Sequence, residues 1–150
     1  MANNEWSMQQ LLSKAEAYCA AAEHCISDVR NKLQQWDATN EEAEQIIAHL
    51  LEEKYIDEVR YCQAFTHDKL LYQGWGRIKI RAALCAKYLP SACIAQALDS
   101  LDEAAYSETL KRVIATKKRA IKSDDPMARE KLIRFCLQRG FTYEEISQHL

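Results

Sequence analysis

Apolar residues recur at three- and four-residue spacing along this chain of 150 residues. That spacing puts them on one side of an α-helix, and no segment shows the convincing alternation of apolar and polar positions that is typical of a half-buried strand. The pattern therefore predicts an all-α fold in which each helix buries one apolar stripe. The chain contains only 3 Gly and 2 Pro, and this scarcity of helix breakers favours the same interpretation.

Three landmarks of this pattern recur together, at a spacing of about 45 to 50 residues. They are a tyrosine (Tyr18, Tyr61, Tyr106), the start of an Arg-x-x-Leu pattern (Arg30, Arg81, Arg129) and the start of an Ile-x-x-x-Leu pattern (Ile46, Ile94, Ile146). Because three patterns agree on one period, the sequence predicts a tandem array of three units, at residues 12–56, 57–101 and 102–150. Such an array presents one long surface, which suits a long partner.

Residues that favour helix starts divide each unit into three helices. The predicted capping or first-turn residues are Ser13, Ser27 and Asn40 in unit one, Asp57 and Pro90 with Ser91 in unit two, and Asp102, Pro126 and Thr142 in unit three. Gly74 and Gly76 predict a tight turn, and Gly140 predicts the left-handed end of a helix from which Phe141 folds back into the core. Because almost no linker separates the units, we expect neighbouring units to pack on each other.

Composition limits the class of protein. Apolar residues make up 48% and charged residues 28% of the chain, which is typical of globular proteins. No run approaches the roughly 18 uninterrupted apolar residues of a membrane span. The first residues also lack a basic region followed by an apolar core. We therefore expect a cytoplasmic protein that makes no membrane contact.

The six cysteines do not form the pattern of a metal site or a disulfide framework. No Cys-x-x-Cys occurs, and most of the cysteines lie among apolar residues of predicted helices. His24 beside Cys25 is a weak ligand pair, because no second pair accompanies it. We expect reduced, mostly buried thiols, and neither a metal nor another cofactor.

Charge is distributed unevenly along the chain. Residues 1–58 contain 4 Lys or Arg and 12 Asp or Glu, a balance of −8, whereas residues 111–139 contain 10 and 3, a balance of +7. The formal net charge of −2 conceals this asymmetry. Charged helix faces usually serve only to keep a protein solvated. A basic stretch of this density nevertheless favours contact with phosphates or with an acidic protein groove.

No catalytic motif is present. The sequence lacks a Gly-rich phosphate loop, a Gly-x-Ser-x-Gly turn and a His-Glu-x-x-His helix. Its four histidines have no obvious nucleophile as a neighbour. We therefore predict that the protein is not an enzyme.

The strongest candidate for binding is the string from Gly74 to Arg81. Behind the two glycines that flank Trp75, Arg77 and Arg81 share one helix face and Lys79 lies elsewhere around the helix. A packed tryptophan at a helix entry with merely solvated cations explains the same string about equally well. The cations that we expect to contact a partner are Arg60, Arg77, Lys79, Arg81, Arg129, Lys131, Arg134 and Arg139.

At these residues the sequence resembles the RecX family. The resemblance rests on Tyr55-Ile56-Asp57-Glu58-x-Arg60-Tyr61, on Gly74-Trp75-Gly76 with Ile80-Arg81-x-x-Leu84, and on Lys131-Leu132-x-Arg134 with Arg139-Gly140-Phe141 and Ile146. In unit one, Ala17-Tyr18-Cys19-Ala20 with Glu23-His24 and Val29-Arg30-x-Lys32-Leu33 looks like the opening motif of that family. Each piece is weak, but the ordered set covers about residues 12–150.

The resemblance implies three three-helix repeats, each similar to a helix-turn-helix unit, that form an elongated curved rod. It also implies a regulator of the recombinase RecA, with a place in DNA repair, homologous recombination and the SOS response. RecX-like proteins bind RecA filaments on single-stranded DNA, block filament extension and reduce the ATPase, strand-exchange and co-protease activities of RecA. We expect a monomer, and weak non-specific binding to single-stranded DNA would agree with this function.

The residues alone leave two other classes of protein open. One is a helix-turn-helix-type nucleic-acid-binding regulator that acts directly on DNA, although the pI near 6.1 counts against it. The other is a purely structural helical adaptor. The acidic third helix of unit one, with Glu41, Glu42 and Glu44, cannot act as a DNA recognition helix. Any contact with nucleic acid is therefore expected in units two and three.

Overall fold

The computed structural model describes residues 6–150, and this part of the chain contains nine helices and no strand. The helices are α1 (Met8–Ala21), α2 (Ile26–Gln35), α3 (Asn40–Glu52), α4 (Glu58–Gln73), α5 (Arg77–Ala86), α6 (Ser91–Asp99), α7 (Glu103–Ala120), α8 (Ala128–Gln138) and α9 (Tyr143–Ser147). The all-α fold predicted from the apolar spacing is confirmed.

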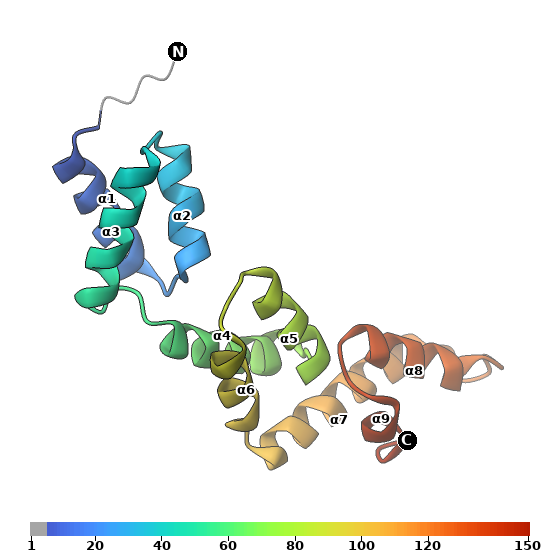
Figure 1. Cartoon of the computed structure of the whole chain (residues 1–150). Helices are drawn as coiled ribbons and strands as arrows, with labels where there is room; N and C mark the ends of the chain where they lie inside the picture. The colour runs from blue at the N-terminus through green and yellow to red at the C-terminus, as the bar shows by residue number, and fades with distance from the viewer. Residues whose placement is uncertain (1–5) are drawn as a thin grey trace.

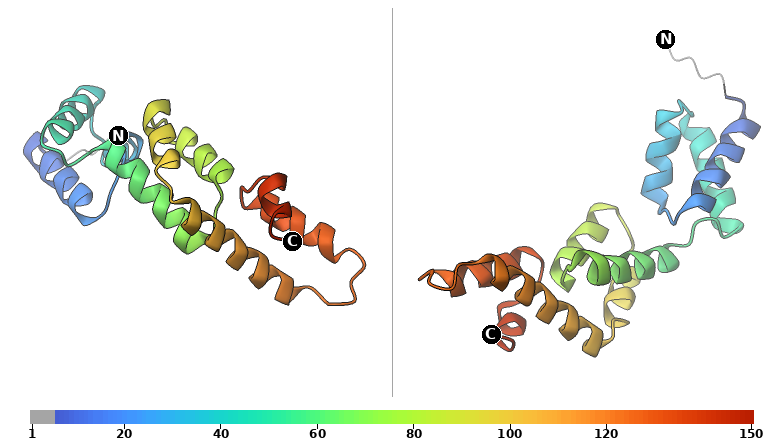
Figure 2. Two further views of the ribbon diagram at one scale, coloured as in Figure 1. Left: turned by 90° about the horizontal axis from the view of Figure 1, so that it is seen from below. Right: turned by 180° about the vertical axis from the view of Figure 1, so that it is seen from behind.

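The helices form three consecutive units along a bent, elongated molecule (Figures 1 and 2). Unit one contains α1–α3, unit two α4–α6 and unit three α7–α9. Units one and three lie at opposite ends, and α4 and α7 are the longest helices, with 16 and 18 residues. The predicted rod of three tandem three-helix units is therefore confirmed, whereas a division into domains at the predicted residues stays a prediction.

Several helix starts agree with the predicted capping residues. The side chains of Asp57, Asp102 and Thr142 accept hydrogen bonds from backbone N–H groups in the first turns of α4, α7 and α9. These N–H groups have no partner inside their own helix, so a side-chain acceptor stabilises the helix start. Pro90 immediately precedes α6, as predicted.

Other predicted helix starts are wrong, because better caps lie earlier in the chain or the turn is longer. Ser7 caps α1 and exchanges two hydrogen bonds with Gln10, so that Ser13 lies inside the helix. Thr39, and not Asn40, caps α3 in the same manner. Two further starts also differ: α2 begins at Ile26, before Ser27, and α8 begins at Ala128, after Pro126.

The second helix of every unit ends in the same left-handed turn. Asp37 follows α2, Tyr88 follows α5 and Gly140 follows α8, with φ angles of 61°, 62° and 98°. In each turn the N–H of the next residue donates to a carbonyl inside the helix, which satisfies one of the last carbonyl groups. Phe141 follows Gly140 into the core and is fully buried, as predicted. Two units make this turn without glycine at φ angles of 61° and 62°, but the φ angle of 98° at Gly140 lies beyond the range that side chains readily adopt and so favours glycine.

Two separate apolar cores stabilise the molecule. The first lies within unit one, around Leu33 and Ile46. The second runs without a break through units two and three, and contains Leu84 of α5 together with Leu110 of α7. Cys25 is the only buried residue of unit one that belongs to this second core. The expectation that neighbouring units pack on each other therefore holds well for units two and three, and poorly for units one and two.

The cysteines are free thiols, and most of them are buried, as predicted. The exceptions are Cys85, which is exposed on α5, and Cys93, which is partly exposed on α6. Burial raises the pKa of the Cys19 thiol to about 11 and that of the Cys62 thiol to about 12. Both groups therefore stay protonated at neutral pH, and a protonated thiol is neither a good nucleophile nor a metal ligand.

Candidate partner-binding surface

The eight cations predicted to contact a partner occupy three settings. Arg60 lies where units one and two meet, Arg77, Lys79 and Arg139 lie where units two and three meet, and Arg81, Arg129, Lys131 and Arg134 lie on exposed parts of α5 and α8. The geometry of the two joints therefore determines which of these side chains already have partners inside the chain.

Arg60 ties the first turn of α4 to unit one. Its Nε donates to Oε2 of Glu23 at 2.6 Å, and its Nη2 donates to the carbonyl oxygens of Lys54 and Tyr55 at 3.1 and 3.3 Å. These two carbonyls lie just beyond the C-terminal end of α3, where the helix dipole favours a cation. The guanidinium therefore holds the corner between α3 and α4.

An ion pair between Asp28 of α2 and Lys87 of unit two is the second contact of this joint, with 2.8 Å between Oδ1 and Nζ. Burial alone would raise the pKa of Asp28. Hydrogen bonding and charge attraction from Lys87, together with hydrogen bonds from the backbone N–H of Cys25 and from His24, outweigh burial, so the pKa lies below its ordinary value. Oε2 of Glu58 adds a third contact by accepting from the backbone N–H of Ile26 at 3.1 Å. Charged side chains thus make the polar contacts between units one and two.

Backbone groups meet directly between units two and three. The N–H of Gly76 donates to the carbonyl of Arg139 at 2.7 Å, and the N–H of Ile78 donates to the carbonyl of Gly140 at 3.1 Å. The end of α8 therefore caps the start of α5. A Cβ on Gly76 would lie 2.5 Å from the carbonyl oxygen of Gly140, and a Cβ on Gly140 would lie 2.5 Å from the backbone nitrogen of Lys79. Only glycine at these two positions permits so close an approach.

Arg77 connects α5 to two helices of unit three. Its backbone N–H donates to the hydroxyl of Tyr106 at 3.0 Å, and its guanidinium lies 4.1 Å from the centroid of that ring. The guanidinium also pairs with Glu103 at 2.7 Å and with Glu145 at 3.8 Å. Burial raises the pKa of Tyr106 to about 12, so its hydroxyl stays protonated at neutral pH. Arg77 is thus engaged in the joint on its backbone and on its side chain.

Aromatic rings hold two more of the predicted cations. Nζ of Lys79 lies 4.5 Å from the centroid of Trp75, and the guanidinium carbon of Arg139 lies 4.8 Å from the centroid of Phe135. Cations attract the faces of such rings. Nη1 of Arg139 also donates to the carbonyl of Gln73 at 2.8 Å. The interpretation of a packed tryptophan therefore describes the observed setting of Trp75 and Lys79 well.

Three of the predicted cations have no such contacts. Within residues 6–150, Arg81, Arg129 and Arg134 form no ion pair and no hydrogen bond through their side chains, and all three are exposed. Lys131 is also exposed but pairs with Asp125 at 2.5 Å. Arg81 lies on α5 and the other three lie on α8. Of the eight predicted cations, those available to a partner therefore belong to units two and three.

Sequence reasoning missed two residues that build the joints. Tyr106 recurs as a landmark of the repeat, but a repeat does not show that a hydroxyl accepts from a residue 29 positions away. No sequence motif includes Lys87, so the sequence did not indicate its role in a joint. The glycines did indicate a joint in the sequence. All 3 of them lie between units two and three, where a Cβ on Gly74 would lie 2.9 Å from Val113.

The described part of the chain contains no group that suggests a metal site. Between residues 6 and 150, no three or more His, Cys, Asp and Glu side chains lie together so as to hold an ion. None of the helices in that range is both long enough and apolar enough to cross a membrane. The arrangement offers a partner an extended surface with exposed cations on units two and three.

Comparison with known proteins identifies the units. Residues 57–98 match the family model described as "RecX, second three-helix domain", and residues 105–150 match "RecX, third three-helix domain". Among solved structures, RecX from Lactobacillus salivarius has a TM-score of 0.81 at 17% identity, over 99% of this chain and 96% of that one. A likeness at this identity shows the shared fold.

Curated relatives match over most of their length. The "Regulatory protein RecX" of Pseudomonas putida is 33% identical over 131 residues, which are 87% of this chain and 83% of the relative. The protein of the same name from Chlorobaculum tepidum is 27% identical over 145 residues, or 97% of this chain and 89% of the relative. With two family models that match its second and third units, the chain belongs to the RecX family of regulatory proteins.

Proposed function

We propose that this protein regulates RecA by binding RecA filaments on single-stranded DNA and inhibiting their extension. The ATPase, strand-exchange and co-protease activities of RecA fall as a consequence. Membership of the RecX family supports this function, and so does the shape, because a rod of three units can contact several subunits of a filament at once. In this proposal the protein acts in the cytoplasm as a monomer and needs no catalytic site.

The observation that carries the proposal at the level of residues is a set of exposed cations whose side chains have no hydrogen-bond or ion-pair partner within residues 6–150, namely Arg81, Arg129 and Arg134. Exposed cations accelerate and orient association with an acidic surface. Arg81 and Arg134 are proposed as direct contacts to the filament. Arg60, Arg77, Lys79 and Arg139 are proposed to contribute through the shape of the rod, because they hold the joints.

The proposal is tested by the ATPase activity of RecA on single-stranded DNA. Substoichiometric amounts of the protein should lower the steady-state rate, because one rod blocks the growth of a filament that contains many RecA subunits. An unchanged ATPase rate and an unchanged filament length at saturating protein would refute the proposed function.

Charge-reversal variants test whether the exposed cations contact the filament at specific positions or act only through the total charge of the protein. The double variant Arg81→Glu and Arg134→Glu should inhibit about tenfold less well than the unaltered protein, since two contacts become repulsive. The matched control is Lys111→Glu with Lys122→Glu, which changes the net charge equally at other exposed positions of unit three. Equal loss in both variants would show that only the total charge of the protein matters. Circular dichroism checks that helix content is unchanged.

Direct contact with single-stranded DNA is a second candidate function. A hollow of about 250 Å³ between the end of α4 and helices α7 and α8 is lined by Tyr72, Arg112, Phe135 and Arg139. Tyr72 is 78% exposed, and aromatic faces beside cations can stack bases. Fluorescence anisotropy with labelled oligo-dT should detect weak binding that salt abolishes, and Tyr72→Ala should weaken it. Binding that is unaffected by Tyr72→Ala would remove this hollow as the site.

A further inference from the structure

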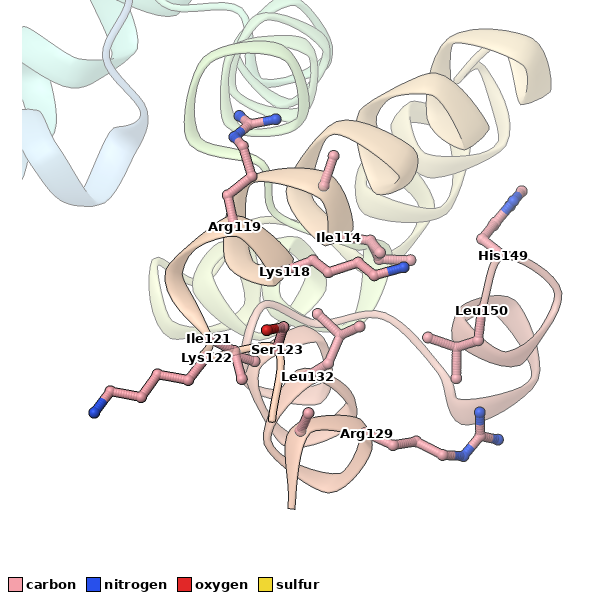
Figure 3. Close-up of a pocket in the computed structure, with 12 residues that line it drawn as sticks. Ile114, Lys118, Arg119, Ile121, Lys122, Ser123, Arg129, Leu132, His149 and Leu150 are labelled. Carbon is pink, nitrogen blue, oxygen red and sulfur yellow. The ribbon is translucent and has the colours of Figure 1, made fainter. Parts of the chain in front are cut away.

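A pocket of about 720 Å³ opens at the end of unit three, between the second half of α7, the start of α8 and residues 149–150 (Figure 3). None of its lining residues forms a hydrogen bond or an ion pair between unit two and unit three, although Ile114 and Leu132 also belong to the apolar core that the two units share. The pocket is therefore separate from the polar contacts of that joint.

The interior of this pocket is aliphatic. Ile114 and Ile121 contribute from the α7 side, Leu132 from α8 and Leu150 from the C-terminal residues. Figure 3 shows Leu132 and Leu150 directed toward the middle of the pocket from different segments. Leu150 is 44% exposed, and Ile121 is also partly accessible to water. Covering such side chains with an apolar group is favourable, by about 25 cal/mol for each Å² removed from water.

The edge of the pocket is basic. Lys118, Arg119, Lys122 and Arg129 all line it, and none of the twelve lining residues is an Asp or a Glu. In Figure 3, Lys118 extends from α7 across the pocket and Arg129 borders it from α8, whereas Arg119 and Lys122 point away from its middle. These four cations form no ion pair with any residue in the range 6–150. The pocket thus combines an apolar floor with cations that no Asp or Glu of its lining faces.

We infer that this pocket is a docking site for an acidic protein segment that carries large apolar side chains on one face. Charge complementarity selects acidic flanks, and the aliphatic floor selects a hydrophobic anchor such as leucine. An amphipathic helix laid into a groove presents its apolar residues in this manner. A nucleic-acid strand fits less well, because no Phe, Tyr or Trp lines the pocket to stack a base.

This inference goes beyond the proposed function and does not depend on it. The segment is defined by its chemistry, and binding is measured with the protein alone, without RecA or DNA. Loss of peptide binding and loss of ATPase inhibition are thus separate results, and either can occur without the other.

Fluorescence anisotropy with a synthetic peptide tests the inference. The probe is a fluorescein-labelled peptide of about three helical turns, rich in Asp and Glu, with leucines spaced four residues apart. The control peptide has serine at the leucine positions and the same charge. The leucine peptide should bind in a saturable manner and at least about tenfold more tightly than the serine peptide, since the anchor fills the aliphatic floor.

Variants place the binding in this pocket. Lys118→Glu with Arg129→Glu should weaken peptide binding by about tenfold or more, because both side chains border the pocket. The matched control, Arg81→Glu with Arg134→Glu, makes the same change in charge on exposed side chains that do not line the pocket, and should weaken binding by less than about threefold. Leu150→Ser tests the apolar part at a partly exposed position where the fold is not at risk.

Three results would overturn the inference. The first is equal affinity for the leucine and serine peptides, which would indicate charge attraction alone. The second is an equal loss in both double variants, because binding would then not depend on the pocket. The third is displacement of the peptide by oligo-dT with tighter binding of the oligonucleotide, which would identify the surface as a nucleic-acid site.

Discussion

The two joints between the units are made of different groups. Between units one and two the polar contacts are side-chain contacts, such as the ion pair of Asp28 with Lys87. Between units two and three, backbone groups of Gly76 and Gly140 meet, and one apolar core runs across the boundary. A partly exposed ion pair contributes only about 0–1 kcal/mol, whereas a joint inside a continuous core opens only when that core opens. We therefore expect units two and three to act as one body, and unit one to move on its own.

The difference shows how one repeating unit can form either kind of joint. All three units end their second helix in a left-handed turn, but Asp37 and Tyr88 carry side chains there and Gly140 does not. Because Gly140 has no Cβ, the start of α5 can approach the end of α8 closely. An array that is rigid at one joint and adaptable at the other can place a fixed basic surface while its acidic end adjusts to a long partner.

The substitution Gly140→Ala should have the largest effect. The added Cβ would lie 2.5 Å from Lys79 in a backbone conformation that side chains rarely adopt, so we expect a loss of about 2–5 kcal/mol in the free energy of unfolding. Urea denaturation measures this loss. The control is Tyr88→Ala in the equivalent turn of unit two, where the side chain is 84% exposed, and it should change stability by less than about 1 kcal/mol. Equal losses in the two variants would contradict a special role for the glycine contact.

Removing the hydroxyl of Tyr106 should have a smaller effect on the same joint. Tyr106→Phe leaves the backbone N–H of Arg77 without its acceptor, at an expected cost of about 1–2 kcal/mol. Thermal unfolding measures the change, and Tyr143→Phe, which alters an exposed ring, is the control. If Tyr106→Phe is as stable as the unaltered protein, the hydrogen bond to Arg77 does not hold the joint.

Substitution of Lys87 should affect the joint between units one and two and not the joint between units two and three. Lys87→Met leaves Asp28 without its cation, and unit one should be released at a cost of about 1 kcal/mol or less, because water screens the partly exposed pair. Unfolding is followed by NMR signals from each unit separately. Signals of unit one should shift to lower denaturant, and those of units two and three should not. A parallel shift of all signals would show that the three units unfold together.

The pKa of Asp28 should give the smallest but most specific effect. In the unaltered protein it is lowered, so the stability from this carboxylate is present above the ordinary pKa near 4 and is lost as the pH falls through the lowered value. The pKa of Lys87 is raised, so its contribution is lost only at strongly alkaline pH. Asp28 and Lys87 should therefore both keep their charges between about pH 5 and 9. Carbon NMR titration should show a higher pKa of Asp28 in Lys87→Met than in the unaltered protein, because the attraction of the cation is lost while burial still raises the pKa. An unchanged pKa of Asp28 in that variant would contradict this account.

The sequence predicted the arrangement of the fold well, because apolar spacing and local caps determine helices. Asp57, Asp102 and Thr142 begin helices as expected, since a capping side chain acts within its own turn. Ser13 and Asn40 were misleading because a residue that can cap a helix can also lie within one, and only the competing caps at Ser7 and Thr39 decide between the two.

The candidate surface was harder to predict, because a cation in a motif can have a partner far away in the chain. Arg77 and Arg81 share a helix face in the sequence pattern, yet Arg77 pairs with Glu103 and Glu145 while Arg81 has no partner in the described chain. The pocket of unit three also gave no signal in the sequence, since Lys118 and Leu150 are separated by most of that unit. The basic run at residues 111–139 indicated the charge of the region, but not its aliphatic floor.

Amide hydrogen exchange at Ile26 and Gly76 tests the central claim most directly. Each N–H donates across one joint, that of Ile26 to the side chain of Glu58 and that of Gly76 to the backbone carbonyl of Arg139. We predict that Gly76 exchanges only with the unfolding of the shared core of units two and three, at a rate that salt does not change. Ile26 should exchange faster, and faster still when NaCl is raised from about 0.05 to about 1 M. Equal protection of the two amides, or an exchange rate of Gly76 that rises with salt, would contradict the account.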